Sequence, residues 1–558
     1  MGRVVQRRAD REERAAGAAR AARAAGRASG AGVGGARAIR PGEGRGPAAP
    51  LDSPWWRGAA AVLAGALPAL AFPAPALWWW AYGALVPWLL LAARAPTARR
   101  AMLDGWLGGL GYMLAVHHWL LPSLHVFTLL LAALLGVLWA PFGFLARRLL
   151  GGAPGPGRAA AALLLLPSAW LVPELVRSWQ GLGGPWGLLG SSQWQVGPAL
   201  RLASVGGVWL VGLAVVAVNT AGALLLRAPG ARTLALGGLL AVGVLTASVS
   251  WWAPRPQPAG SARIAYVQPG VIPGVVPRLE REETLTRTLV SRRPDLVVWG
   301  ESSVGADLTR RPGLARRLAA LSRRVGADLL VNVDARRADR PGIYKSAVLI
   351  GADGPTGARY DKRRLVPFGE YVPARALLGW ATSVGKAAGE DRMRGNRQVV
   401  MEVPRARGTD GGPLRIGPLI CFETAFPDLS RRLVRDGAQV VVAQSSTSTF
   451  QDSWAPAQHA SLGALRAAET GRPVVHATLT GVSAAFGPDG ERLGPWLGTD
   501  RSALAVREVP LATGRTLYVR LGDWPVTLAL GSLAVYGGLA AGRRLGGRAG
   551  ASAAADAP

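Results

Sequence analysis

Eight apolar runs of about 20 residues constrain this chain more than any other feature of its sequence. A helix of ~20 residues crosses the ~30 Å hydrocarbon layer of a bilayer. The runs mostly lack the polar face that helices of a soluble core show. The sequence therefore predicts about eight membrane-spanning helices, with approximate bounds 57–74, 76–93, 101–122, 125–146, 159–178, 203–226, 233–252 and 524–542.

The arginines between these runs predict how the chain is oriented. Arginines fill the segment before the first run and follow the second, fourth, sixth and eighth runs, whereas the links after the first and third runs contain no Lys or Arg. Basic residues accumulate on the cytoplasmic side of a membrane. Both termini are therefore expected in the cytoplasm, and the region 261–520, which follows the seventh run, is expected outside it.

The formal net charge of +30 has two interpretations. It could indicate a nucleic-acid partner, or it could reflect the cytoplasmic arginines of a membrane protein. Apolar runs separate the basic clusters, which favours the second interpretation, so no nucleic-acid partner is expected. Residues 1–54 are rich in Ala, Gly and Arg and predict a disordered basic cytoplasmic tail. Residues 546–558 are expected to form a second, short cytoplasmic tail.

The pattern changes between the seventh and eighth runs. Short β-rich runs, at 262–268, 295–301, 327–333, 346–352, 416–422, 438–444 and 473–479, alternate with amphipathic stretches at 279–292, 313–325, 425–436 and 457–470. Such alternation predicts one layered α/β domain. The expected divisions are 55–255 for seven membrane helices, 261–510 for the α/β domain and 520–545 for the eighth membrane helix.

The chain has one cysteine, Cys421, and five histidines without ligand spacing. An intramolecular disulfide framework is excluded, and no metal site is expected. A lone cysteine that ends an apolar strand is commonly a small buried hydrophobe. Two features favour catalysis instead. A helix is expected to begin near Thr424, and its N-terminus would favour the thiolate. A free thiol outside the cytoplasm is also exposed to oxidation, so its retention suggests a use.

Two other segments place charged residues in apolar surroundings. Glu301 ends the strand of VVWGESS, and Lys362 and Glu370 flank the apolar LVPFG of RYDKRRLVPFGEYVP. An isolated charge of this kind is usually solvated at the surface, but partial burial would require a partner. These residues are therefore candidates to act together with Cys421.

Four motifs in a fixed order resemble one family: WGES, YDKRRLVPFGEYVP, ICFE and RAAETGRPVVHATLTGVSAAFGPDG. Together with GGPWGLLGSSQ at 183–193, they are similar to the apolipoprotein N-acyltransferases, membrane-embedded members of the nitrilase, or carbon–nitrogen hydrolase, superfamily. The resemblance implies an extracytoplasmic nitrilase-like αββα sandwich, carried between the seventh and eighth helices of a multi-pass protein of the bacterial cytoplasmic membrane.

The resemblance also implies the site and the reaction. Cys421 matches the nucleophile, Glu301 the general base and Lys362 the group that stabilises the oxyanion. Supporting positions are matched by Glu370, Phe422 and Glu423, with the backbone N–H of Phe422 assisting Lys362. A phospholipid, expected to be phosphatidylethanolamine, would acylate Cys421. The α-amine of a diacylglyceryl-cysteine at a lipoprotein N-terminus would then take the acyl chain, and no cofactor is needed.

Three segments depart from the family pattern. Residues 445–450 read SSTSTF where the family often has Ser-Asn-Asp-Ala-Trp-Phe. Phe422 replaces a usual Tyr, and no Trp follows Ile272–Pro273 at the position of a functional family tryptophan. The triad is intact, so these departures concern how the lipid is held.

An apolar loop at 375–385 follows the FGE motif and contains Leu377, Leu378 and Trp380, which we expect to form a lid or lipid entry. Two alternatives remain open at this stage. One is a membrane-tethered hydrolase of small amides or nitriles, which would have no need of this loop. The other is a scaffold with a decayed nitrilase domain, which the intact triad and Glu370 disfavour.

Overall fold

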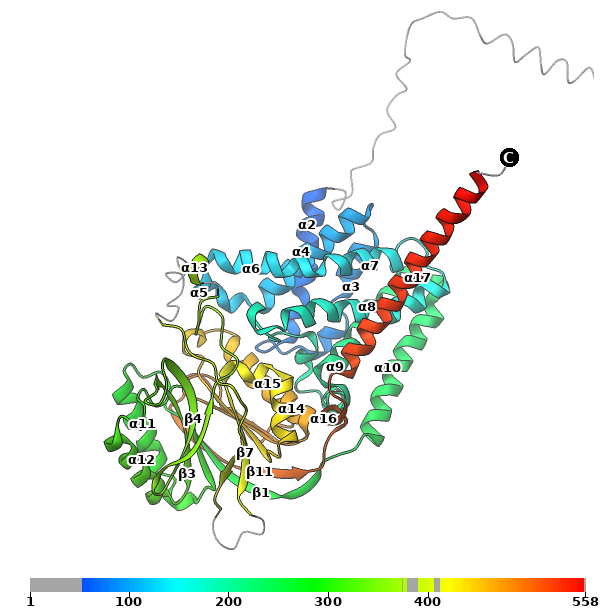
Figure 1. Ribbon diagram of the computed structural model, residues 1–558. Coiled ribbons are helices and arrows are strands. Elements are labelled where there is room, and N and C mark those ends of the chain that lie inside the picture. Colours follow the sequence, from blue (N-terminus) through cyan, green and yellow to red (C-terminus); the bar gives the residue numbers. More distant parts are fainter. Residues whose placement is uncertain (1–52, 374, 379–389, 406–411, 556–558) are drawn as a thin grey trace, which may run out of the picture. The chain divides into compact units, whose positions relative to one another are not determined.

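A computed structural model describes residues 53–373, 375–378, 390–405 and 412–555 of the 558-residue chain (Figure 1). Residues from Pro54 onward belong to one compact unit. Residues 1–52 of the expected basic tail and Trp380 lie outside the described residues, as do the side chains of Leu377 and Leu378. Pro54, the last residue of the expected tail, begins a helix.

Helices build the apolar part of this unit. They are α2 (Pro54–Ala66), α3 (Val86–Ala93), α4 (Ala98–Val116), α5 (Leu121–Leu124), α6 (Val126–Gly136), α7 (Ala140–Leu150), α8 (Pro156–Arg177), α9 (Gly197–Arg227), α10 (Arg232–Trp252) and α17 (Trp524–Ala555). Short 3₁₀ turns separate several of them, including η2 (Leu67–Ala71), η3 (Trp78–Tyr82), η5 (Val137–Trp139) and η7 (Leu189–Gln193).

Five stretches of the described residues are long and apolar enough to cross a membrane. They are Val126–Leu150, Pro156–Arg177, Gly197–Arg227, Pro229–Trp252 and Trp524–Arg543, which correspond to the last five expected runs. A shorter apolar helix covers Trp78–Ala93. The first expected run is divided between α2 and η2, and α4 carries Arg99, Arg100 and Asp104 near its start. The count of eight spans remains a prediction.

An aromatic cluster and a buried ion pair hold the helical part together. The rings of Trp88, Tyr112, Trp139, Phe142 and Trp170 meet at centroid distances of 5.4–5.7 Å, mostly edge to face. The fully buried carboxylate of Asp104 accepts hydrogen bonds from Arg57, at 2.8 Å, and Arg100, at 2.8 Å. These partners offset the cost of burying the charge of α4.

Two sheets form the α/β part. The first has the strand order β11-β1-β2-β3-β4-β5 and the second the order β10-β9-β8-β7-β6. The strands of the first sheet are β1 (Gln257–Gln268), β2 (Leu296–Trp299), β3 (Asp328–Arg336), β4 (Ile343–Gly351), β5 (Gly354–Asp361) and β11 (Ala503–Thr513). Those of the second are β6 (Met401–Val403), β7 (Leu414–Ile420), β8 (Val440–Ser445), β9 (Val474–Thr478) and β10 (Ala484–Phe486).

Strand alternation sorts the apolar side chains into layers. Leu296 and Val298 of β2 share a core cluster with residues of the second sheet, whereas Val297 and Trp299 share one with α12 (Pro312–Val325). Helices α11 (Val275–Arg287) and α12 cover the outer face of the first sheet, and α14 (Pro427–Arg435) and α15 (Ala455–Thr470) cover the second (Figure 1). The expected αββα sandwich is present.

The sheets approach closely at Gly300, next to Glu301. A Cβ added at Gly300 would lie 1.9 Å from the backbone nitrogen of Leu479. Gly300→Ala should therefore push β2 away from the second sheet and destabilise the domain by about 1–3 kcal/mol, the usual cost of overpacking. The measurement is the thermal unfolding midpoint of the purified protein. Gly313→Ala is the matched control, because nothing lies within 4 Å of a Cβ there. Equal midpoints for both variants would contradict this account of the interface.

Candidate active site

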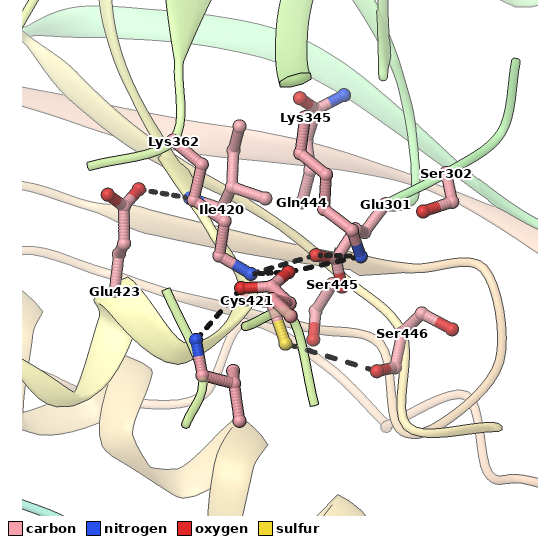
Figure 2. A network of polar contacts seen from close by, with 12 residues as sticks. Glu301, Ser302, Lys345, Lys362, Ile420, Cys421, Glu423, Gln444, Ser445 and Ser446 are labelled. Carbon is pink, nitrogen blue, oxygen red and sulfur yellow. Dashed lines mark hydrogen bonds and ion pairs between the residues drawn. The ribbon is translucent and has the colours of Figure 1, made fainter. Parts of the chain in front are cut away.

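Three strand ends and one further strand bring the charged candidates together with the thiol (Figure 2). Glu301 follows β2, Lys362 follows β5 and Cys421 follows β7, while Lys345 lies on β4 itself. The backbone N–H of Glu301 donates to the carbonyl of Ser445 at the end of β8, at 3.0 Å. This bond joins the sheets at the point where parallel strands of both end.

Two lysines and two glutamates form a buried ion cluster. The Lys362 ammonium donates to Glu301 Oε1 at 2.9 Å and to Glu370 Oε1 at 2.8 Å. The Lys345 ammonium contacts the same two oxygens, at 2.9 and 3.2 Å. Glu370 Oε2 also accepts from the backbone N–H of Val366. Only 1% of Lys362 is exposed, so its charge depends on these carboxylates.

Cys421 occupies a strained turn. Its φ is +51°, a left-handed conformation that few non-glycine residues adopt. The turn begins the 3₁₀ helix η11 (Cys421–Ala425), and Sγ lies 3.9 Å from the carbonyl of Ser446. His459 Nε2 donates to the carbonyl oxygen of Cys421 at 2.9 Å, and the other ring nitrogen lies 3.1 Å from Ser445 Oγ. Backbone strain held by a buried partner is typical of active sites.

Glu423 ties this turn to the segment that carries Lys362. Its fully buried carboxylate accepts from the backbone N–H groups of Ile420, Arg363 and Arg364 at 2.8–3.0 Å and from the hydroxyl of Tyr360 at 2.7 Å. These bonds fix the turn at Ile420 against the segment Tyr360–Arg364. Phe422 places its ring edge-on against Phe426 at 4.9 Å.

The carboxylates and the thiol of the site have pKa shifts in opposite directions. Burial alone would raise the pKa of Glu301, but the ammoniums of Lys345 and Lys362 lower it to about 2. Glu370 has a lowered pKa because the same lysines outweigh its burial. Burial and the charge of Glu301 raise the pKa of the Cys421 thiol to about 11. In the resting site, the carboxylates are ionised and the thiol keeps its proton.

The expectation that a helix N-terminus favours the thiolate is therefore wrong for the resting site. A 3₁₀ turn of five residues follows Cys421, and α14 begins only at Pro427. Burial and the nearby carboxylates dominate the thiol instead.

The helical part of the chain packs against the turn that carries Cys421. A Cβ at Gly184 would lie 2.6 Å from the Phe422 ring, so the motif at 183–193 needs glycine there. Trp186 Nε1 donates to Gln458 Oε1 at 2.9 Å, and its ring lies 5.2 Å from that of His459. The thiol turn thus packs directly on the loop between α8 and α9.

Sequence reasoning identified Glu301, Lys362, Glu370 and Cys421, which the structure brings together, but it missed Lys345 and His459. A lysine within the otherwise apolar strand IYKSAVLIG was the available signal for Lys345. His459 gave no signal, because its contact with Cys421 depends on tertiary packing. Of the expected lid, the backbone of Leu377 and Leu378 falls in α13 (Arg375–Leu378), and Trp380 lies outside the described residues. Among those residues, no group of three or more His, Cys, Asp or Glu is placed to hold a metal ion.

Two families match consecutive parts of the chain. Residues 64–221 match the apolipoprotein N-acyltransferase N-terminal domain, and residues 263–518 match the carbon–nitrogen hydrolase family. Among solved structures, an amidase from Nesterenkonia sp. is similar over 47% of this chain and 94% of its own, with 18% identity and a TM-score of 0.32.

Two relatives are similar to most of this chain. The apolipoprotein N-acyltransferase of Geobacter metallireducens is 30% identical over 87% of this chain and 95% of its own length. That of Methylococcus capsulatus is 32% identical over 80% of this chain and 88% of its own. The resemblance inferred from the motifs is confirmed, and with it the assignment as an acyltransferase. The chain belongs to the apolipoprotein N-acyltransferase family.

Proposed function

We propose that this protein moves an acyl chain from a phospholipid, through a thioester on Cys421, to the α-amine of the diacylglyceryl-cysteine that begins an apolipoprotein. The contact of the nucleophile turn with the loop at 183–193 carries the proposal. It places the turn that carries Cys421 on the loop between the apolar helices α8 and α9, where we expect the lipid substrates to reside. At this position, an acyl chain can pass from the phospholipid to the lipoprotein without entering water.

In the first half-reaction, the Cys421 sulfur attacks the ester carbonyl of the phospholipid while Glu301 takes the thiol proton. Lys362 and the backbone N–H of Phe422 stabilise the negative charge that forms on the carbonyl oxygen, and a donor of this kind commonly contributes about 3–4 kcal/mol. The carbon–oxygen bond then breaks. The departing alkoxide takes the proton from Glu301 and leaves as a lysophospholipid.

In the second half-reaction, the lipoprotein amine attacks the thioester carbonyl and Glu301 takes one amine proton. Collapse of the tetrahedral intermediate forms the amide and breaks the carbon–sulfur bond. The thiolate recovers the proton from Glu301, which returns the site to its resting state. The chain's own residues thus supply every proton transfer, with water excluded by burial of the cluster.

We also propose the number of membrane spans and their orientation. The distribution of arginines supports eight spans, cytoplasmic termini and an α/β domain on the extracytoplasmic side. Lipoprotein N-termini would meet the enzyme on that side of the bacterial cytoplasmic membrane.

The nucleophile assignment predicts that Cys421→Ala makes no triacylated product. Purified protein would be incubated with a phospholipid labelled in its acyl chains and a diacylated lipopeptide, and products would be measured by mass spectrometry. Thermal unfolding close to that of wild type serves as the control for folding. Transfer by Cys421→Ala would contradict the mechanism. Labelled fatty acid released by wild type without amide formation would favour a hydrolase instead.

The pKa values predict that thioester formation depends little on pH between about 5 and 9. With the Glu301 pKa lowered to about 2 and the Cys421 pKa raised to about 11, neither group changes its charge in this window. Attack by a free thiolate would accelerate tenfold per pH unit instead. Glu301→Gln, which keeps the shape and removes the base, should block thioester formation throughout. A tenfold rise per unit in wild type would remove Glu301 from its role.

The topology can be tested with single cysteines in the Cys421→Ala background, which contains no other thiol. A cysteine at the exposed Ala338 of the α/β part should react with a membrane-impermeant maleimide applied to intact cells, after removal of any outer envelope. A cysteine at Gly230, between α9 and α10, should react only after the membrane is opened, because this link is predicted to be cytoplasmic. The reverse pattern would invert the orientation.

A further inference from the structure

The ion cluster contains one cation more than the triad needs. Lys345 makes the same two contacts as Lys362, to Glu301 Oε1 and Glu370 Oε1. With both lysines protonated and both glutamates ionised, the four side chains sum to zero charge. Without Lys345, the cluster would carry one uncompensated negative charge beside the thiol.

The composition of the chain makes lysine at this position informative. The chain has 64 Lys and Arg residues in total, but only three of them are lysines: Lys345, Lys362 and Lys386. Two of the three therefore lie in this cluster. A lysine ammonium is a compact point charge, whereas the arginine head is a planar fork. Lys345→Arg would therefore keep the charge of the cluster and change only the shape of the side chain, so it can separate the contributions of charge and shape.

We propose that Lys345 is a positioning residue that balances the charge of Glu301 and Glu370, so that Cys421 can become an anion and Lys362 keeps one N–H free for the oxyanion. This role rests on the proposed acyl transfer. Lys362 has three N–H donors, of which Glu301 and Glu370 take two. Lys345 also contacts both carboxylates. The third N–H of Lys362 is therefore available when the oxyanion forms.

The other groups around this site do not replace Lys345. Asp334 lies 3.9 Å from Lys345, and Arg392 pairs with Asp334 at 3.2 Å, so these two charges offset each other. His459 contacts the Cys421 carbonyl and is neutral, because burial lowers its pKa to about 4. Burial and the charges of Glu301 and Glu370 raise the pKa of the thiol, against which Lys362 and then Lys345 act.

The test uses the alkylation of Cys421, the only thiol of the chain, by iodoacetamide, which reacts with the free thiolate. Lys345→Met should slow alkylation about tenfold at each pH between about 8 and 9.5, equivalent to a rise of about one unit in the thiol pKa. The dependence on pH should keep its slope. Lys345→Arg retains the charge and should alkylate within about threefold of wild type. Thioester formation from phospholipid should fall with the Met variant and recover with Arg.

Arg340→Met is the matched control, since it removes one exposed positive charge near the start of β4. It should leave alkylation unchanged. The proposal is overturned if a folded Lys345→Met protein alkylates at the wild-type rate, or if Arg340→Met slows alkylation equally. Should Lys345→Met fail to fold, the double variant Lys345→Met, Glu370→Gln restores neutrality and must alkylate faster than Lys362→Met, which leaves the cluster negative.

The same experiment separates this inference from the proposed function. If wild type forms no thioester from phospholipid, the proposed acyl transfer fails, whatever the alkylation rates. If wild type forms the thioester and Lys345→Met alkylates normally, the acyl transfer stands and the role of Lys345 is wrong.

Discussion

The buried pairing of Lys362 with Glu301 and Glu370 is the interaction on which the rest of the site depends. Each carboxylate is buried, and each would be costly to keep ionised without an adjacent ammonium. The lysine, in turn, would not stay protonated at 1% exposure without them. The segment that ends at Glu301 and the segment that carries Lys362 and Glu370 must therefore come together, although they are distant in the sequence. Three features hold them in place: the strand ends, the hydrogen bond from Glu301 to Ser445 between the sheets, and the Glu423 carboxylate, which binds the segment that carries Lys362.

A second set of buried polar contacts connects the turn that follows Cys421 to the helical part. Helix α9 is kinked at Gly206 and Gly207, which frees the backbone N–H of Val208. Glu469 of α15 accepts that N–H at 2.8 Å and pairs with Arg466, which donates to the carbonyl of Ala425 at the end of η11. Each partner is fully buried. The thiol turn is therefore held by the helices as well as by the sheets, which suits the proposed reaction on lipid substrates.

Much of this arrangement was predictable from the sequence. All seven β-rich runs form strands and all four amphipathic stretches form helices. The runs are short and rich in β-branched residues, and the alternation of the two kinds of segment indicates a layered α/β domain. Strands β5, β6, β10 and β11 were not predicted. β6 and β10 are only three residues long, and β11 depends on pairing with β1, more than 230 residues away. Motifs identified the triad, but the contacts of Lys345 and His459 and the raised thiol pKa follow from packing, which spacing does not encode.

The proposed role of Cys421 is to carry the acyl chain between the two lipids. Intact-protein mass spectrometry after incubation with phospholipid alone is the clearest test of it, with peptide mapping to locate the adduct. We expect one added acyl chain on the peptide that contains Cys421. The adduct should disappear when a diacylated lipopeptide is added, with an equal amount of triacylated product. An adduct on another residue, or triacylated product formed while a stable adduct persists on Cys421, would contradict it.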